Sequence, residues 1–134
     1  MEVNEIQIGG KHYKREYQHW DLVCDLELHY LLGCSTKYVS RWQEKNGLED
    51  LRKSLHYIAK FEDKGLLVEE YTHEQSNNLD MFCDQLHHVD GIIVKLICLG
   101  SFEEVVKLIN ELIEEVENGP TSNYVDPDNN YIRG

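Results

Sequence analysis

The chain has 134 residues, a length typical of one globular domain, which excludes a large enzyme with separate cofactor and substrate domains. Its 41% hydrophobic and 28% charged residues are ordinary for a globular protein, and its nine glycines and two prolines are too few for a fibrous or linker-like chain. The formal net charge of −12 excludes non-specific binding to duplex nucleic acid, which requires a basic face.

The charge is unevenly distributed along the chain. Residues 10–64 carry ten basic and nine acidic side chains, whereas residues 65–134 carry three basic and fourteen acidic ones. The cations therefore gather in the first half, and the second half is predicted to be an acidic shell over apolar stripes. This asymmetry fits a local anion site within an otherwise repelling protein, and it equally fits acidic helices that are merely well solvated.

Neither the N-terminus nor any later segment predicts a membrane or secretory protein. Residues 1–10 lack the basic and apolar regions of a signal peptide, and the longest apolar stretch, residues 91–99, is too short to span a bilayer. No pair of cysteines has C-x-x-C spacing, so we expect buried free thiols in a reducing compartment. Three of these cysteines have apolar neighbours: Cys24, Cys83 and Cys98.

Apolar periodicity predicts one compact all-α domain over residues 1–119. Residues 8–64 are expected to hold short helices behind a short extended N-terminal arm, and residues 65–119 two longer helices. Residues 120–134 read as an irregular tail. No alternating apolar pattern is long enough to predict a sheet.

The first three helices are predicted from their start and stop signals. One is expected to begin near Asp21, and a second to run from either His29 or Ser35 to Gln43. Apolar residues at helical spacing predict a third helix over residues 48–63. Glycines mark the ends of the second and third helices: Gly47 and Gly65.

The two longer helices follow. The first is expected to begin with a capping box at residues 72–75, to carry one apolar stripe for about 25 residues, and to end at Gly100. Gly91 interrupts this stripe and predicts a close approach of another backbone. A second capping box at residues 101–104 opens the last helix, which ends at residues 118–119. Its apolar stripe is broad enough to cover a core and a partner helix, so a homo-oligomer is expected.

A first group of candidate ligand-binding residues lies near the N-terminus, in a predicted loop. Backbone N–H groups of glycine can approach an anion, lysine supplies a point charge, and an aromatic ring can stack on a base. The alternative is a flexible surface turn, with the tryptophan in the core. The residues are Gly10, Lys11, His12, Tyr13, His19 and Trp20.

A second group lies on the next predicted helices. Lys37 and Arg41 share one face at i, i+4 spacing, and Tyr38 and Trp42 share the adjacent face. A row of cations beside a row of aromatic rings suits a nucleotide, because cations bind its phosphate and aromatic rings stack on its base. Lys53 extends the basic face. The alternative is that nearby carboxylates pair with these cations: Glu49 and Asp50.

No metal, cofactor or catalytic site is predicted. Cys83 and His87 have the i, i+4 spacing of two zinc ligands, but further ligands are not evident nearby. Residues 126–130 begin like a calcium loop, yet Tyr131 occupies the position that requires glycine. The serines lack the motif of a nucleophile elbow.

Four strings of the first half are familiar: IGGKHY (8–13), HWDL (19–22), GCSTKYVSRW (33–42) and KNGLEDLRKSLHYI (45–58). They resemble a widespread family of small proteins of tailed phages and prophages, generally described as of unknown function. A related domain resembles part of a nucleotide kinase of T-odd coliphages, which lacks a P-loop and phosphorylates deoxynucleoside monophosphates as a large oligomer. The resemblance implies a phage protein in the cytoplasm of an infected bacterium.

Three hypotheses follow. The first is that the protein sequesters a phosphorylated nucleotide, such as a cyclic signalling nucleotide of the host's antiviral defence, and performs no chemistry. The second is a P-loop-less deoxynucleoside monophosphate kinase, with Glu49 and Asp50 as magnesium ligands. The third is an acidic module that inhibits a host protein. We rank sequestration slightly ahead of kinase activity, and we expect no membrane or duplex partner.

Overall fold

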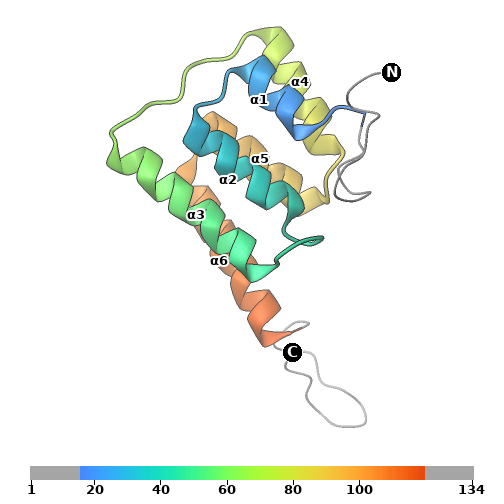
Figure 1. Cartoon of the computed structure of the whole chain (residues 1–134), viewed down its shortest axis with the longest axis vertical. Helices are drawn as coiled ribbons and strands as arrows, with labels where there is room; N and C mark the ends of the chain where they lie inside the picture. The colour runs from blue at the N-terminus through green and yellow to red at the C-terminus, as the bar shows by residue number, and fades with distance from the viewer. Residues whose placement is uncertain (1–15, 120–134) are drawn as a thin grey trace.

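Six α-helices and the segments that connect them form residues 16–119, the part of the chain that the computed structural model describes (Figure 1). No strand occurs within this range, so the predicted all-α fold is confirmed. The helices are α1 (His19–Leu26), α2 (Tyr30–Arg41), α3 (Leu48–Asp63), α4 (His73–Asp84), α5 (His88–Leu99) and α6 (Phe102–Asn118).

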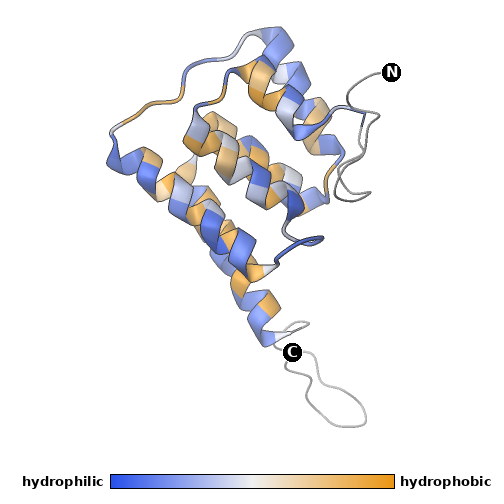
Figure 2. Cartoon of the chain, in the orientation of Figure 1, coloured by the Kyte–Doolittle hydropathy of each residue, from blue (hydrophilic) through white to orange (hydrophobic). Residues whose placement is uncertain are grey.

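Helix α5 lies at the centre and contacts α2, α4 and α6. Helix α3 packs against α2 and α6, and α1 packs against α4 and α2. Hydrophobic and hydrophilic residues alternate around each helix, so every helix turns an apolar side inward (Figure 2). The largest side chains of the resulting core are less than 2% exposed: Phe61, Phe82, Leu22, Leu51, Ile58, Ile93, Ile97 and Ile109.

Helix α3 spans residues 48–63, as predicted. Gly47 precedes it with φ +57°, a backbone conformation that side chains other than glycine rarely adopt. Two acids in the first turn stabilise the helix, because their negative charge lies at the positive end of the helix dipole. Leu51 and Ile58 on the apolar side of the helix are buried. Gly65 follows the helix with φ +68°, which confirms it as the terminating glycine.

The predicted single helix from residue 73 to Gly100 is wrong, because α4 ends at Asp84 and α5 begins at His88. Both helices bury their apolar sides in the same core, so the stripe continues in phase across the break. Residues 65–119 therefore hold three helices. The close approach predicted at Gly91 is confirmed: a Cβ there would lie 2.6 Å from the Cys83 carbonyl oxygen at the end of α4.

The two predicted capping boxes differ in outcome. The Gln75 N–H donates to Thr72 Oγ1 at 3.1 Å and the Thr72 N–H donates to Gln75 Oε1 at 2.8 Å, so the first box is confirmed. The second is wrong, because the Ser101 side chain makes no capping hydrogen bond. Its ψ of 62° departs from the extended backbone of a typical N-cap, and its N–H donates to the Leu96 carbonyl instead.

The apolar stripe of α6 is used largely within the chain. Val105, Ile109 and Ile113 are buried, and α6 packs against α3 and α5. Val106 and Val116 remain 37% and 43% exposed. Among residues 16–119, no helix has the length and apolar character needed to cross a membrane.

Candidate ligand-binding face

Two buried serines join α2 to α3. The Oγ atoms of Ser35 and Ser54 lie 2.7 Å apart, and each hydroxyl contacts the other residue's carbonyl oxygen at 3.0 Å. Both residues are fully buried. Small side chains let the two helices approach closely, and these reciprocal hydrogen bonds fix which residues of α2 and α3 face each other.

A cluster of aromatic and basic side chains lies beside these serines, and we call it the aromatic–cation cluster: Tyr38, Arg41, Lys53 and Tyr57. The rings of Tyr38 and Tyr57 stack with centroids 5.8 Å apart and an interplanar angle of 12°. Arg41 Cζ lies 4.8 Å and Lys53 Nζ 5.4 Å from the Tyr38 centroid, both within cation–π range. The structure thus brings together three residues predicted for the site.

Carboxylates of α3 pair with both cations of the cluster. Arg41 Nε lies 3.6 Å from Asp50 Oδ2, and Lys53 Nζ lies 3.2 Å from Glu49 Oε2. The hydrogen bond with Glu49 raises the pKa of Lys53. The alternative of ion-paired cations is therefore confirmed for Arg41 and Lys53, and these two cations and their two carboxylates together are neutral.

Asp50 is buried completely at the start of α3. Its Oδ2 accepts the Asn46 N–H at 3.2 Å, whereas Oδ1 makes no hydrogen bond with the described part of the chain. A buried carboxylate is stable only with a counter-charge and donors, so Arg41 is essential to this corner.

Lys37 lies one helical turn before Arg41 and is exposed. It forms no ion pair with residues 16–119. Since Asp50 and Glu49 neutralise the two cations of the cluster, Lys37 supplies a net positive charge at its edge.

The aromatic surface continues along α2 beyond the predicted residues. Tyr30, Cys34 and Tyr38 are spaced at i, i+4 and i+8, and Tyr30 is 71% exposed. A hydrogen bond with Cys34 raises the pKa of Tyr30, and burial raises that of Tyr57. The i, i+4 spacing could have identified both from the sequence, since Tyr30 precedes Cys34 and Tyr38 along α2 and Tyr57 follows Lys53 along α3.

The two N-terminal candidates that the structure describes, His19 and Trp20, lie on α1 and apart from the cluster. His19 Nε2 lies 2.8 Å from Thr36 Oγ1, and its ring packs edge-on to Phe82 at 5.9 Å. Trp20 is 51% exposed, so the alternative of a core tryptophan is wrong. The remaining four candidates lie outside the described residues: Gly10, Lys11, His12 and Tyr13.

Trp42 does not lie beside Tyr38 as a second stacking ring. Its Nε1 donates to Asp90 Oδ1 at 2.9 Å, and Gln43 Nε2 donates to Asp90 Oδ2 at 2.8 Å. Asp90 is 3% exposed in the first turn of α5. The end of α2 is thus joined to α3 by the ion pair of Arg41 and to α5 by the hydrogen bond of Trp42.

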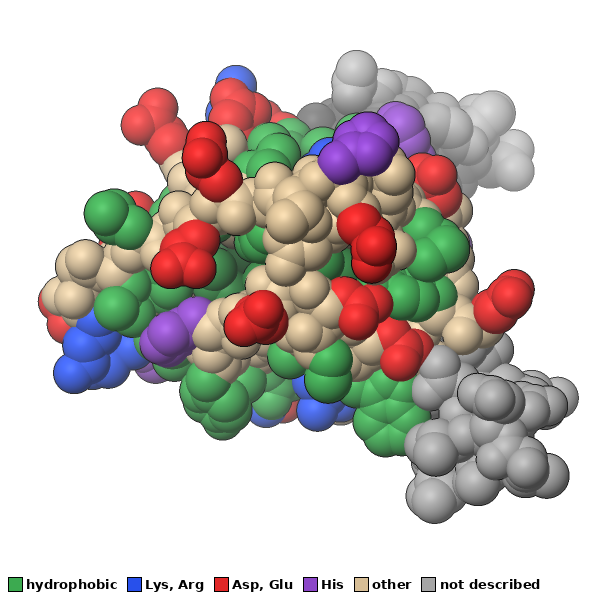
Figure 3. Space-filling view, turned by 90° about the horizontal axis from the view of Figure 1, so that it is seen from above, with side chains coloured by type: hydrophobic (Ala, Val, Ile, Leu, Met, Phe, Trp, Pro, Cys, Tyr) green, Lys and Arg blue, Asp and Glu red, His purple; other side chains and the backbone are tan. Residues whose placement is uncertain are grey.

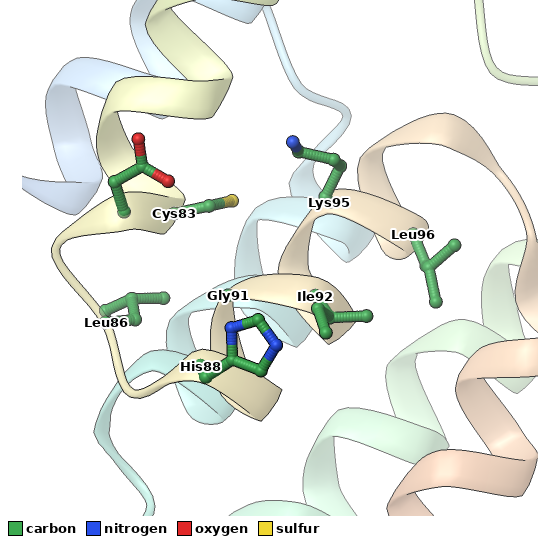
Figure 4. A pocket seen from close by; sticks show the side chains of 8 residues that line it. Cys83, Leu86, His88, Gly91, Ile92, Lys95 and Leu96 are labelled. Atoms are coloured by element: carbon green, nitrogen blue, oxygen red, sulfur yellow. The ribbon is translucent and has the colours of Figure 1, made fainter.

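A separate hollow of about 280 Å³ lies between α4 and α5. The Cys83 sulfur points into it, with His88 and Lys95 nearby (Figure 4). Burial raises the pKa of the Cys83 thiol from 9.0 to about 12, which disfavours the thiolate that zinc binds. Within residues 16–119, no three potential ligands gather at one point.

The four thiols differ in exposure. Cys83 and Cys98 are buried as predicted, and burial also raises the pKa of Cys98. Cys24 is exposed, so that part of the prediction is wrong: its apolar neighbour Val23 lies on the inner side of α1 and the thiol on the outer. Cys34 is half-buried.

Comparison with known protein families gives a match over the first half of the chain. No curated protein and no solved structure matches the chain. A family model described as a protein of unknown function, DUF3310, matches residues 8–59. This range includes α1, α2 and the first three turns of α3, and with them every residue of the aromatic–cation cluster. Residues 8–59 are therefore similar to a domain of unknown function, DUF3310.

Proposed function

We propose that the aromatic–cation cluster binds a phosphorylated nucleotide and that the protein sequesters it without chemistry. The stacked pair of Tyr38 and Tyr57, with a guanidinium and an ammonium within 4.8 and 5.4 Å of one ring, carries the proposal. An aromatic surface accepts a nucleobase by stacking, and adjacent cations bind phosphate oxygens.

The cations of this face can reach a phosphate at low cost. Lys53 and Glu49 are 44% and 62% exposed, and an ion pair in water contributes little free energy. Lys53 can therefore turn from Glu49 to a phosphate. Lys37 is exposed one turn from Arg41 and adds the net charge that an anion requires.

The state of the two acids favours capture over phosphoryl transfer. A kinase would use Glu49 and Asp50 as magnesium ligands. Asp50 is wholly buried against Arg41, and Glu49 pairs with Lys53. Both acids are therefore ion-paired with cations of the cluster. A protein that only binds a nucleotide does not need them as magnesium ligands.

The resemblance to phage proteins supplies the biological setting of the proposal. A phage protein in the cytoplasm of an infected bacterium would gain by removing a nucleotide that the host uses for antiviral signalling. Tight binding suffices for this, because a stoichiometric sponge needs no turnover.

The test is a retention-and-release assay. The full-length protein is incubated with linear and cyclic nucleotides, with and without ATP and magnesium, separated from free ligand, and denatured by heat. Chromatography and mass spectrometry then identify the released compound. A nucleotide returned unchanged supports sequestration, whereas one returned with an added phosphate only when ATP is present supports the kinase.

Matched lysine variants locate the site. Lys37→Ala and Lys53→Ala are each expected to weaken retention about tenfold, the effect of losing one charge-assisted hydrogen bond. Lys107→Ala removes an exposed lysine from α6 and should leave retention unchanged. Equal effects of all three substitutions would contradict the assignment to α2 and α3.

The acidic surface favours a second candidate, an acidic module that inhibits a host protein. On the face seen in Figure 3, acidic side chains are spread across the surface and basic ones lie toward its edges. Helix α6 exposes several acids along its length: Glu103, Glu104, Glu111, Glu114 and Glu115. If no nucleotide is retained, this candidate leads, and neutralising the α6 acids should then abolish function while Lys37→Ala does not.

A further inference from the structure

The surface between α2 and α3 offers two separate aromatic platforms. Tyr30, at the start of α2, is 71% exposed and lies eight residues before Tyr38. Eight residues of α-helix rise about 12 Å, so Tyr30 lies two turns from the stacked pair of Tyr38 and Tyr57. Within the described part of the chain, no other aromatic ring stacks on Tyr30. Its ring is therefore a second stacking surface.

Cys34 lies between the two platforms. The thiol is half-buried, one turn after Tyr30 and one turn before Tyr38. A hydrogen bond with Cys34 raises the pKa of Tyr30, and burial together with the nearby Cys34 raises the pKa of Tyr57. The thiol therefore lies close to both phenols and joins the three rings into one surface. We call this surface the α2–α3 strip: Tyr30, Cys34, Tyr38 and Tyr57.

Two exposed lysines border the strip and are not neutralised by carboxylates of the described residues. Lys37 and Lys60 form no ion pair within residues 16–119. Lys60 follows Lys53 and Tyr57 at i+7 and i+3, on the same side of α3. In a chain of net charge −12, two such lysines on one face favour a ligand with two negative groups.

These two lysines lie at opposite ends of the strip. Helices α2 and α3 run antiparallel, so the end of α3 lies beside the start of α2 (Figure 1). The rings of His29 and Phe61, one at each of these helix ends, are 5.4 Å apart. Their neighbours in sequence, Tyr30 and Lys60, therefore belong to the same end. The other lysine directly precedes Tyr38.

We propose that the nucleotide bound on this strip is a dinucleotide, linear or cyclic, with two bases and two phosphate groups. This inference rests on the proposed function and narrows its class of ligand. One base stacks at Tyr38 and the other at Tyr30, and a lysine at each end binds a phosphate. A mononucleotide would occupy only one of the two platforms.

Equilibrium dialysis of the full-length protein tests the proposal. The probes are adenosine monophosphate, a linear adenine dinucleotide with two phosphates, the cyclic adenine dinucleotide, and the corresponding three guanine compounds. At least one dinucleotide is expected to bind about tenfold or more tightly than the mononucleotide of the same base, the effect of stacking one further base. The comparison of linear with cyclic compounds then shows which form the strip prefers.

Variants at the Tyr30 end separate the two platforms. Tyr30→Ala and Lys60→Ala should each lower the affinity for the dinucleotide about tenfold and leave that for the mononucleotide unchanged. Lys53→Ala, at the aromatic–cation cluster, should lower both affinities. Tyr30→Phe keeps the ring and is the matched control, which should bind both ligands like the wild type. All three side chains are on the surface, and circular dichroism confirms that each variant is folded.

The outcomes distinguish this inference from the proposed function. Equal affinity for mononucleotides and dinucleotides, or an unchanged affinity of Tyr30→Ala for the dinucleotide, overturns the inference and leaves the proposed function standing. An equal loss in Tyr30→Phe and Tyr30→Ala also overturns it, because the hydroxyl and not the ring would then bind the ligand. Since stacking tolerates any base, the absence of binding by every probe overturns the proposed function as well.

Discussion

The α2–α3 and α4–α5 interfaces hold their helices together by opposite means. Between α2 and α3, buried polar groups meet, namely Ser35 with Ser54 and Arg41 with Asp50. Between α4 and α5, Gly91 brings the backbones so close that a single methyl group would meet the Cys83 carbonyl at 2.6 Å. The first interface fixes the positions of buried polar groups, whereas the second fixes a short distance between two backbones and adds one exposed ion pair, Lys95 with Asp80.

The comparison also explains where the candidate site lies. Buried hydroxyls and a carboxylate require defined partners, so they determine which faces of α2 and α3 are in register. The stack of Tyr38 on Tyr57 is a consequence of that register. The α4–α5 hollow has no comparable support, since its one lysine is paired with Asp80 outside it.

The largest effect is expected from breaking the polar interface at its buried charge. Asp50→Ala leaves the Arg41 guanidinium, only 19% exposed, without its carboxylate. We expect a loss of about 3 kcal/mol in the free energy of unfolding, measured by urea denaturation. Glu49→Ala, which removes a carboxylate that is 62% exposed, should cost about 0.5 kcal/mol or less. Equal losses would show that burial of Asp50 is not what stabilises this corner.

Two glycines test the steric interface. Gly91→Ala should cost about 2–3 kcal/mol, because the helices α4 and α5 must separate to admit the methyl group. Gly33→Ala on α2 is the control: its Cβ would meet only the Val23 side chain, at 3.6 Å. There, alanine should stabilise the protein by about 0.5–1 kcal/mol through its higher helix propensity. Destabilisation of equal size at both positions would refute the distinction between the interfaces.

The helices themselves follow from local sequence signals. Residues 48–63 carry a regular apolar period between two glycines, and the capping box at residues 72–75 depends only on neighbours in sequence. The break between α4 and α5 could not be predicted from periodicity, because the apolar stripe stays in phase on both sides. Gly91 was the feature of the sequence that indicated a close contact here, and that contact is with Cys83 on the preceding helix.

The candidate site was predictable only in part, for a related reason. The pairing of Arg41 with a carboxylate after the turn follows from short chain distance, and the structure selects Asp50. Tyr57 and Trp42 depend on long-range register instead. Trp42 finds its acceptor 48 residues away at Asp90, and no local pattern specifies that partner.

A smaller effect should come from the serine pair at the polar interface. Ser35→Ala leaves the buried Ser54 hydroxyl without its Oγ partner and should cost about 1–2 kcal/mol. The double variant Ser35→Ala and Ser54→Ala removes both polar groups, so its cost should be less than the sum of the two single costs. Urea denaturation of the four proteins gives this coupling energy, and strict additivity would argue against a shared hydrogen bond.

The smallest effect concerns the thiols that the α4–α5 interface buries. Burial raises the pKa of Cys83 from 9.0 to about 12, so between these values the folded protein holds a proton that the unfolded chain has lost. Stability is therefore retained below pH 9 and falls as the pH rises toward 12. From about pH 8 to about pH 10 we expect a loss of about 1 kcal/mol from this thiol. Cys83→Ala, which cannot lose a proton, should show a flatter decline in urea denaturation. An unchanged slope would mean that the decline arises from other groups, such as Cys98, whose pKa burial also raises.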